Sequence, residues 1–194
     1  FTFRRCIAFN RFETKRFDIF PYTSENCMVA IARPSVHSAD FAQDENILAQ
    51  EIERVLLFSE AFVQKKKLLQ SFFSDYLENH GRIAFFGAGH FACVFINIFD
   101  LKDYIECIID DNKNKQGLIM PGSNLPILDS SALLENNIKL SIFSLNPDVE
   151  DKIISKNAEF VGKGGHFLSI SPASNHSLYS YIEKHNLIAL KEES

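Results

Sequence analysis

The stretch that decides the fold of this chain is GRIAFFGAGHFA, at residues 81–92. It opens with a short apolar run, residues 82–86, which is typical of a buried parallel strand. The residues after this run fit the G-x-G-x-x-A pattern, with its small positions at Gly87, Gly89 and Ala92. The pattern predicts a strand, a tight turn and a helix, in that order.

Each small residue of the turn has a physical reason. Gly87 permits the tight bend, Gly89 lets a phosphate approach the backbone, and Ala92 allows the helix to pack closely on the strand. The helix that follows offers unpaired N–H groups and a partial positive charge at its first turn. We therefore expect an anion at Gly87, Ala88, Gly89 and His90, and the alternative is a tight turn without a ligand.

Downstream of the turn, apolar strand patterns alternate with helical ones. Further strands are predicted at residues 104–109, 140–145 and 166–170. Helices are predicted at residues 131–136, from Asn146-Pro147 onward, and at 177–184. This alternation indicates an α/β fold, a Rossmann-like parallel sheet with helices on both faces, which we assign to residues 81–194.

Upstream of the turn, the pattern predicts a β-hairpin and a long helix. Residues 16–20 and 27–32 read as its two strands, and one interpretation of the hairpin region, residues 1–34, is the remnant of an upstream domain. Residues 35–80 read as a long helical linker, whose residues 45–79 form either one helix or two with a break near Ser59. Such a helix must pack on the next domain, on another chain or on a missing domain.

The second predicted strand of the sheet ends at a group of candidate ligand-binding residues. Asp110 stands where dinucleotide folds place an acid on a ribose hydroxyl, although an ordinary turn is an equal interpretation. Lys113 and Lys115 begin a long loop and offer positive charge to a phosphate, with solvated lysines as the alternative. We also expect His166, at the start of the last strand, to reach the same rim as His90.

Composition excludes some classes of function. The 194 residues carry a net charge of -5, which counts against a nucleic-acid partner. The four cysteines form no C-x-x-C pair, so we predict no metal site. No apolar run reaches the length of a membrane span, and we expect a cytoplasmic protein without membrane contact.

Three stretches together carry a family resemblance: residues 81–90, 109–117 and 120–127. They resemble the C-terminal domain of the SAM-dependent sugar C-methyltransferases, with Leu-Pro-Ile at residues 125–127 where the family has Ile-Pro-Ile. The resemblance implies a Rossmann-like domain that helps to hold a nucleoside-diphosphate sugar. It also implies that the SAM site and the catalytic residues lie in upstream domains, and we find neither motif in this chain. We therefore predict no cofactor bound by this chain and leave its catalytic residues unassigned.

The resemblance also extends the candidate site. It adds residues of the loop after the second strand, namely Gln116, Gly117, Pro121 and Gly122. The turn is similar as well to the nucleotide-sugar-binding domain of the sugar acyltransferases, but no hexapeptide repeat follows it here.

Three functions stay open at this point. The first is the nucleotide-sugar-binding portion of a C-methyltransferase-like enzyme of deoxysugar or polysaccharide biosynthesis, which does not catalyse on its own. The second is an NAD(H)-binding Rossmann domain, either a redox sensor or a dehydrogenase fragment. The third is an interaction module without a ligand, in which the helix at residues 45–79 mediates assembly.

Overall fold

The computed structural model describes residues 2–21, 26–36 and 45–185 of the chain. These residues divide into two compact units, Phe1–Glu60 and Ala61–Ser194.

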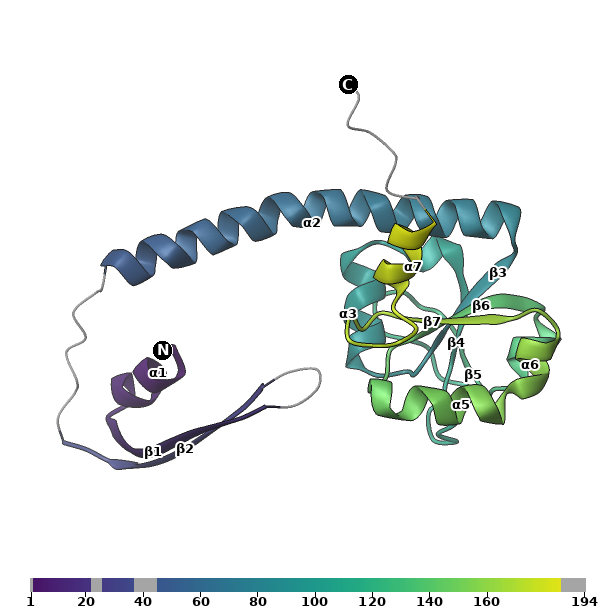
Figure 1. The fold of residues 1–194 in the computed structure, drawn as a ribbon. Coiled ribbons are helices and arrows are strands. Elements are labelled where there is room, and N and C mark those ends of the chain that lie inside the picture. The colour runs from purple at the N-terminus through teal and green to yellow at the C-terminus, as the bar shows by residue number, and fades with distance from the viewer. Residues whose placement is uncertain (1, 22–25, 37–44, 186–194) are drawn as a thin grey trace, which may run out of the picture. The chain divides into compact units, whose positions relative to one another are not determined.

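The first unit contains a hairpin and a short helix (Figure 1). Strands β1 (Phe12–Pro21) and β2 (Asn26–Pro34) pair antiparallel, from Phe12 opposite Pro34 to Pro21 opposite Asn26. The predicted hairpin is thus confirmed, and its turn, residues 22–25, lies outside the described residues. The sequence analysis predicted no helix before the hairpin, but Thr2–Phe9 forms helix α1.

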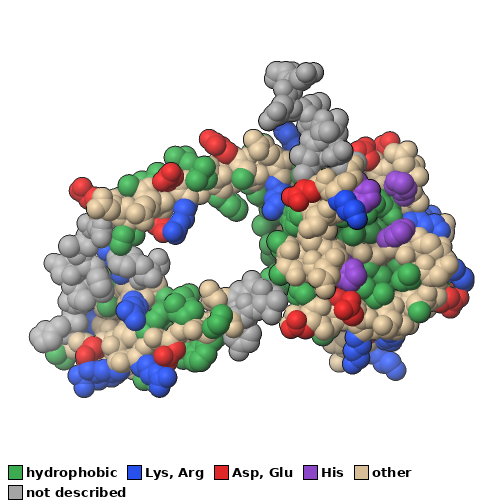
Figure 2. All heavy atoms as spheres, in the orientation of Figure 1, with side chains coloured by type: hydrophobic (Ala, Val, Ile, Leu, Met, Phe, Trp, Pro, Cys, Tyr) green, Lys and Arg blue, Asp and Glu red, His purple; other side chains and the backbone are tan. Residues whose placement is uncertain are grey.

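A single long helix, α2 (Glu45–Asn79), follows without a break at Ser59. It contains no glycine or proline that would interrupt it. Its second half lies in the second unit, where Leu69, Phe73 and Tyr76 are buried. Its first half has no buried residue, and Figure 2 shows hydrophobic side chains on its visible surface.

The second unit is built around a five-stranded parallel sheet (Figure 1). Its strands are β3 (Arg82–Phe86), β4 (Ile105–Ile109), β5 (Ile127–Leu128), β6 (Ile138–Phe143) and β7 (His166–Ser169). Their spatial order is β5-β4-β3-β6-β7, so the first strand of the sheet lies at its centre. The chain leaves β3 towards β4 and later returns to β6 on the other side. This is the topological switch point at which open α/β sheets bind ligands.

Helices cover both faces of this sheet, which confirms the predicted Rossmann-like α/β fold. The helices of the unit besides α2 are α3 (His90–Ile98), α4 (Ala132–Glu135), α5 (Glu150–Lys156), α6 (Ala158–Gly162) and α7 (Leu178–Lys184). Phe85 belongs to a core with α2, α3 and α7, and Phe86 to a second core with α4 and α6. Successive strand residues point to opposite faces, so one strand supplies both cores.

Candidate functional site

The turn after β3 is held tightly between its two neighbouring strands. The Gly87 N–H donates to the carbonyl of Ile109, 2.7 Å away, at the end of β4. On the other side, the buried Ser144 hydroxyl lies 2.8 Å from the Gly87 carbonyl oxygen and donates to it. Gly87 has φ +106°, and a Cβ there would lie 2.5 Å from Cδ2 of Leu145. Gly87 is therefore required by backbone conformation and by internal packing.

Gly89 differs from Gly87 in both respects. Its φ of -109° and ψ of -178° are extended backbone that any residue adopts. A Cβ at Gly89 would meet no atom within 4 Å among the described residues. The packing of the described residues therefore does not require a glycine here, and the missing side chain leaves open space.

This open space lies at the first turn of α3. Within the described part of the chain, no side chain caps the helix at Gly89. The first N–H groups of a helix have no partner inside the helix, and the helix dipole places positive charge there. His90 is exposed at this turn, and its ring packs on that of Phe91 with 4.0 Å between centroids. The geometry suits an anion.

Asp110, directly after β4, is already held by several donors of the chain. Its Oδ2 accepts from the Ala88 N–H at 2.8 Å, and its Oδ1 from the Asn112 N–H at 2.9 Å. Burial raises the pKa of Asp110, but the hydrogen bonds from Asn112, Lys115 and Ala88 outweigh this effect, so the pKa of the carboxyl lies below its ordinary value. The Asn112 contact is the local turn geometry expected of an aspartate at this place.

Two residues of the following loop reach back to the same place. The Lys115 ammonium lies 2.9 Å from Oδ2 of Asp110 and 3.0 Å from the Ala88 carbonyl oxygen. The Gln116 side-chain amide donates to the Asp110 carbonyl at 3.0 Å. The Gly117 N–H donates to the carbonyl of Ile127, in β5, at 2.9 Å. These hydrogen bonds therefore hold the loop beside the turn.

The other predicted loop residues are less closely tied to the turn. Lys113 is exposed and makes no ion pair among the described residues. The Pro121 carbonyl accepts from the Asn97 amide at 3.1 Å, and a Cβ on Gly122 would lie 2.5 Å from the oxygen of that amide. Asn97 stands seven residues after His90, about 10 Å further along α3. Pro121 and Gly122 therefore pack on the far part of α3.

The expectation for His166 is wrong. His166 is the first residue of β7 and pairs with Leu140, near the start of β6. All strands of the sheet are parallel, so His166 lies at their amino ends, whereas the turn at residues 87–90 lies at their carboxyl ends.

Sequence reasoning missed polar residues that shape this edge. Ser144 directly follows β6, the strand beside β3, and its hydrogen bond to Gly87 joins residues 57 positions apart. Glu150 is buried at the start of α5, where it accepts from the hydroxyls of Ser169, at 2.6 Å, and Ser174. It thereby fixes the segment after β7. The position of Ser144 at the switch point is the one signal that would have found it.

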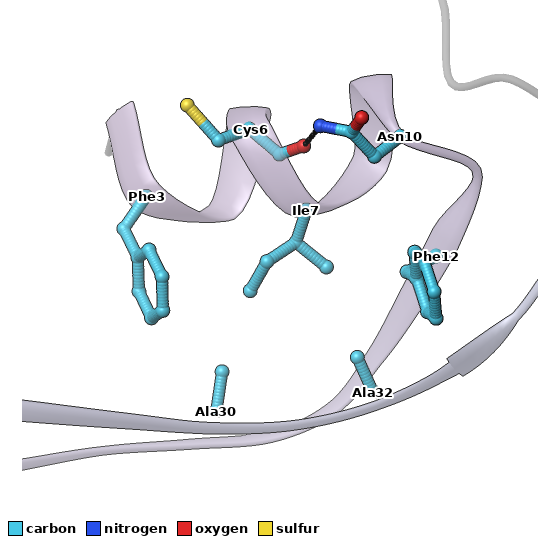
Figure 3. Close-up of a pocket in the computed structure, with 7 residues that line it drawn as sticks. All are labelled: Phe3, Cys6, Ile7, Asn10, Phe12, Ala30 and Ala32. Atoms are coloured by element: carbon cyan, nitrogen blue, oxygen red, sulfur yellow. Dashed lines mark hydrogen bonds between the residues drawn. The ribbon is translucent and has the colours of Figure 1, made fainter.

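A hollow of about 410 Å³ lies in the first unit (Figure 3). It is lined by residues of α1 and the hairpin, namely Phe3, Cys6, Ile7, Asn10, Phe12, Ala30 and Ala32. Its lining has no charged group, and the Asn10 amide donates to the Cys6 carbonyl at 2.8 Å. The hollow offers apolar surface and no counter-charge for a phosphate.

The described residues contain no cluster of three or more histidine, cysteine, aspartate or glutamate side chains placed to hold a metal ion. Among them, no helix has the length and apolar character needed to cross a membrane.

The fold and the turn define a Rossmann-like α/β domain with an open helix N-terminus at its switch point. Residues 28–172 match the family described as the C-methyltransferase C-terminal domain. The chain therefore belongs to that family, as the resemblance predicted. A search of the curated proteins gives no match.

Two solved structures illustrate how distant the structural relatives are. UDP-D-quinovosamine 4-dehydrogenase from Vibrio fischeri matches with a TM-score of 0.38 and 17% identity, over 54% of this chain and 84% of its own. RSP, a Rex-family repressor, matches with a TM-score of 0.36 and 13% identity, over 78% and 99%. These TM-scores are too low to carry an argument about ligand or activity.

Proposed function

We propose that the second unit binds a nucleoside-diphosphate sugar for a C-methyltransferase-like enzyme, and positions it without catalysing methyl transfer. The observation that carries the proposal is Gly89. Its missing side chain leaves open space in front of the uncapped N-terminus of α3, at the carboxyl ends of the strands. Membership in the family of C-methyltransferase C-terminal domains supports a role beside a methyltransferase.

In this proposal the diphosphate lies against the first-turn amides of α3. The Ala88 N–H is committed to Asp110, so the amides that remain are those from Gly89 onward. Lys115 supplies positive charge beside them. SAM and the catalytic groups would be supplied by another part of the enzyme.

Calorimetric titration of the whole chain with dTDP, UDP, NADH and SAM tests the proposal. We expect saturable binding of a nucleoside diphosphate and its loss in Gly89→Val, because the valine side chain would occupy the open space. Gly162→Val is the matched control. Gly162 also has open space around its Cβ position, but it ends α6, near the amino end of β7. Binding of NADH alone would favour the dinucleotide function, and no binding by the wild-type chain would refute the proposal.

A second role, in assembly, is favoured by the first unit. Among its described residues none is buried, although α2 alone exposes Leu48, Ile52, Val55 and Phe58 there. A hairpin of two strands is only marginally stable without a surface to pack on. We propose that this unit packs on the catalytic part of the enzyme. Light scattering tests the main alternative, because a mass that rises with concentration would show that a second copy covers the surface.

A further inference from the structure

Asp110 stands where dinucleotide-binding folds place the acid that binds a ribose diol. A diol donates two hydrogen bonds, so that role needs an exposed carboxylate with free acceptor positions. The Asp110 side chain is only 13% exposed. Its Oδ2 already accepts from Ala88 and Lys115, and its Oδ1 from Asn112. The acid is thus largely covered by its own chain.

The group that covers it is the Lys115 ammonium. An ammonium has three donors, and two of them reach Oδ2 of Asp110 and the Ala88 carbonyl. The third has no partner among the described residues, and the Lys115 side chain is 38% exposed. Lys115 therefore neutralises the acid and keeps one charged donor available beside the turn.

The position of this ammonium is fixed from both sides. The Gln116 amide holds the loop to the Asp110 carbonyl at 3.0 Å, and the Gly117 N–H holds it to β5. Lys115 also bonds to Ala88, directly before the open space at Gly89. A phosphate in that space would meet an ammonium in place of a bare carboxylate.

We infer that Lys115 determines how this site recognises its ligand: it covers the acid that would bind a ribose diol and binds the diphosphate, so that the site holds a nucleoside diphosphate through its phosphates and not through its ribose. The inference rests on the proposed function and assigns the phosphate contact to one residue. A bare carboxylate here would repel a phosphate and attract a diol, whereas the ion pair attracts a phosphate and occupies acceptors that a diol would use.

Lys115→Met and the matched control Lys102→Met test this inference by calorimetry on the whole chain. The ligands are UDP, whose ribose has a 2′-hydroxyl, and dTDP, whose sugar lacks it. Both variants remove one positive charge from the second unit, and Lys102 lies at the opposite, amino end of β4. We expect Lys115→Met to weaken nucleoside diphosphate binding about ten- to a hundredfold, as the loss of a charge-assisted hydrogen bond does. The wild-type chain should bind UDP and dTDP with similar affinity, because Asp110 is paired with Lys115 and does not hold the ribose. Lys102→Met should stay within about twofold, because Lys102 is exposed and makes no ion pair among the described residues.

Two more variants separate this role from a structural one. Lys115→Arg keeps the charge, and we expect it to restore most of the affinity that Lys115→Met loses. Asp110→Asn keeps an acceptor for the Ala88 N–H but removes the negative charge, so the affinity for UDP or dTDP should hold or rise. A direct role of Asp110 on a ribose would instead make Asp110→Asn weaken binding.

The outcomes also separate this inference from the proposed function. Wild-type chain that binds neither UDP nor dTDP refutes the proposed function, and the inference with it. Wild-type chain that binds them while Lys115→Met binds equally well leaves the proposed function standing and overturns the inference. A loss of affinity in Asp110→Asn that matches the loss in Lys115→Met overturns it too.

Discussion

Both halves of α2 carry leucine and phenylalanine, but only the second half buries them. Leu69 and Phe73 are fully buried in the core of the second unit, whereas Leu57 is 59% and Phe58 70% exposed in the first unit. The apolar content of the two halves is similar, so composition alone does not make a core. What differs is the surface available: the second half packs on a sheet, and the described part of the first unit supplies only a hairpin and a short helix.

The difference also agrees with the two roles proposed for the units. The second unit positions a turn with fixed hydrogen bonds, as a binding site requires. The first unit presents apolar surface with no core of its own among its described residues, as a docking element does.

The largest expected difference is in amide hydrogen exchange. We expect amides of β1 and β2 to exchange at least about a thousandfold faster than those of β3 and β6, because local opening of the hairpin breaks few buried contacts. Mass-spectrometric exchange on the whole chain measures this. Equal protection of both sheets would mean that the hairpin is covered in solution, and dilution would then show whether a second copy covers it.

The same substitution in the two halves of α2 gives the next largest effect. Leu69→Ala removes a fully buried side chain and should lower the free energy of unfolding of the second unit by about 2–5 kcal/mol. Leu57→Ala, on the exposed half of the same helix, should change it by less than about 0.5 kcal/mol. Urea denaturation followed by circular dichroism measures both. A large loss from Leu57→Ala would contradict the absence of a core around the first half of α2.

Within the second unit, Gly87 and Gly117 both have a positive φ, but only Gly87 has another side chain against its Cβ position. Gly87→Ala forces a left-handed backbone and drives a Cβ into Leu145, so we expect a loss of about 2–4 kcal/mol. Gly117 has φ +80° but open space around its Cβ position, so Gly117→Ala should lower the free energy of unfolding by only about 1 kcal/mol. Thermal and urea unfolding compare them. Equal losses would show that the contact with Leu145 relaxes freely.

The sequence predicts the sheet well because its strands and helices carry regular apolar patterns. Asn146 and Pro147 show this: the pair predicts a helix start, and the Asn146 side chain does accept from the Asp148 N–H. Among the elements that the sequence did not predict, two have short patterns. Helix α1 has only eight residues, two of them arginines, and β5 has only two residues. Neither spans enough periods to be distinguished from a loop.

The candidate site was less predictable, because sequence does not show what a glycine packs against. Gly87 and Gly89 occupy equivalent places in the motif, yet one is required by Leu145 and the other faces open space. Gly122 follows Lys115 by only seven residues in the sequence, but it packs on Asn97. The hydrogen bond between Ser144 and Gly87 joins the ends of β6 and β3, which become neighbours only in the folded sheet. These distinctions depend on tertiary contacts that no local pattern encodes.

The smallest expected effect is the pH dependence of the bonds at Asp110. The hydrogen bonds that lower its pKa in the folded state stabilise the fold above the unfolded pKa of about 3.9, and this contribution is lost as the pH falls through the folded value. Asp110→Asn should therefore cost about 1–3 kcal/mol at neutral pH and less below about pH 4. The matched control is Asp111→Asn, which breaks a more exposed pair with Lys156 and should cost at most about 1 kcal/mol. Urea denaturation between pH 3 and 7 measures both variants against the wild-type chain. A cost of Asp110→Asn that stays constant across this range would mean that charge does not hold the carboxylate in place. The packing around the turn would then have to supply that stability in place of the ion pair.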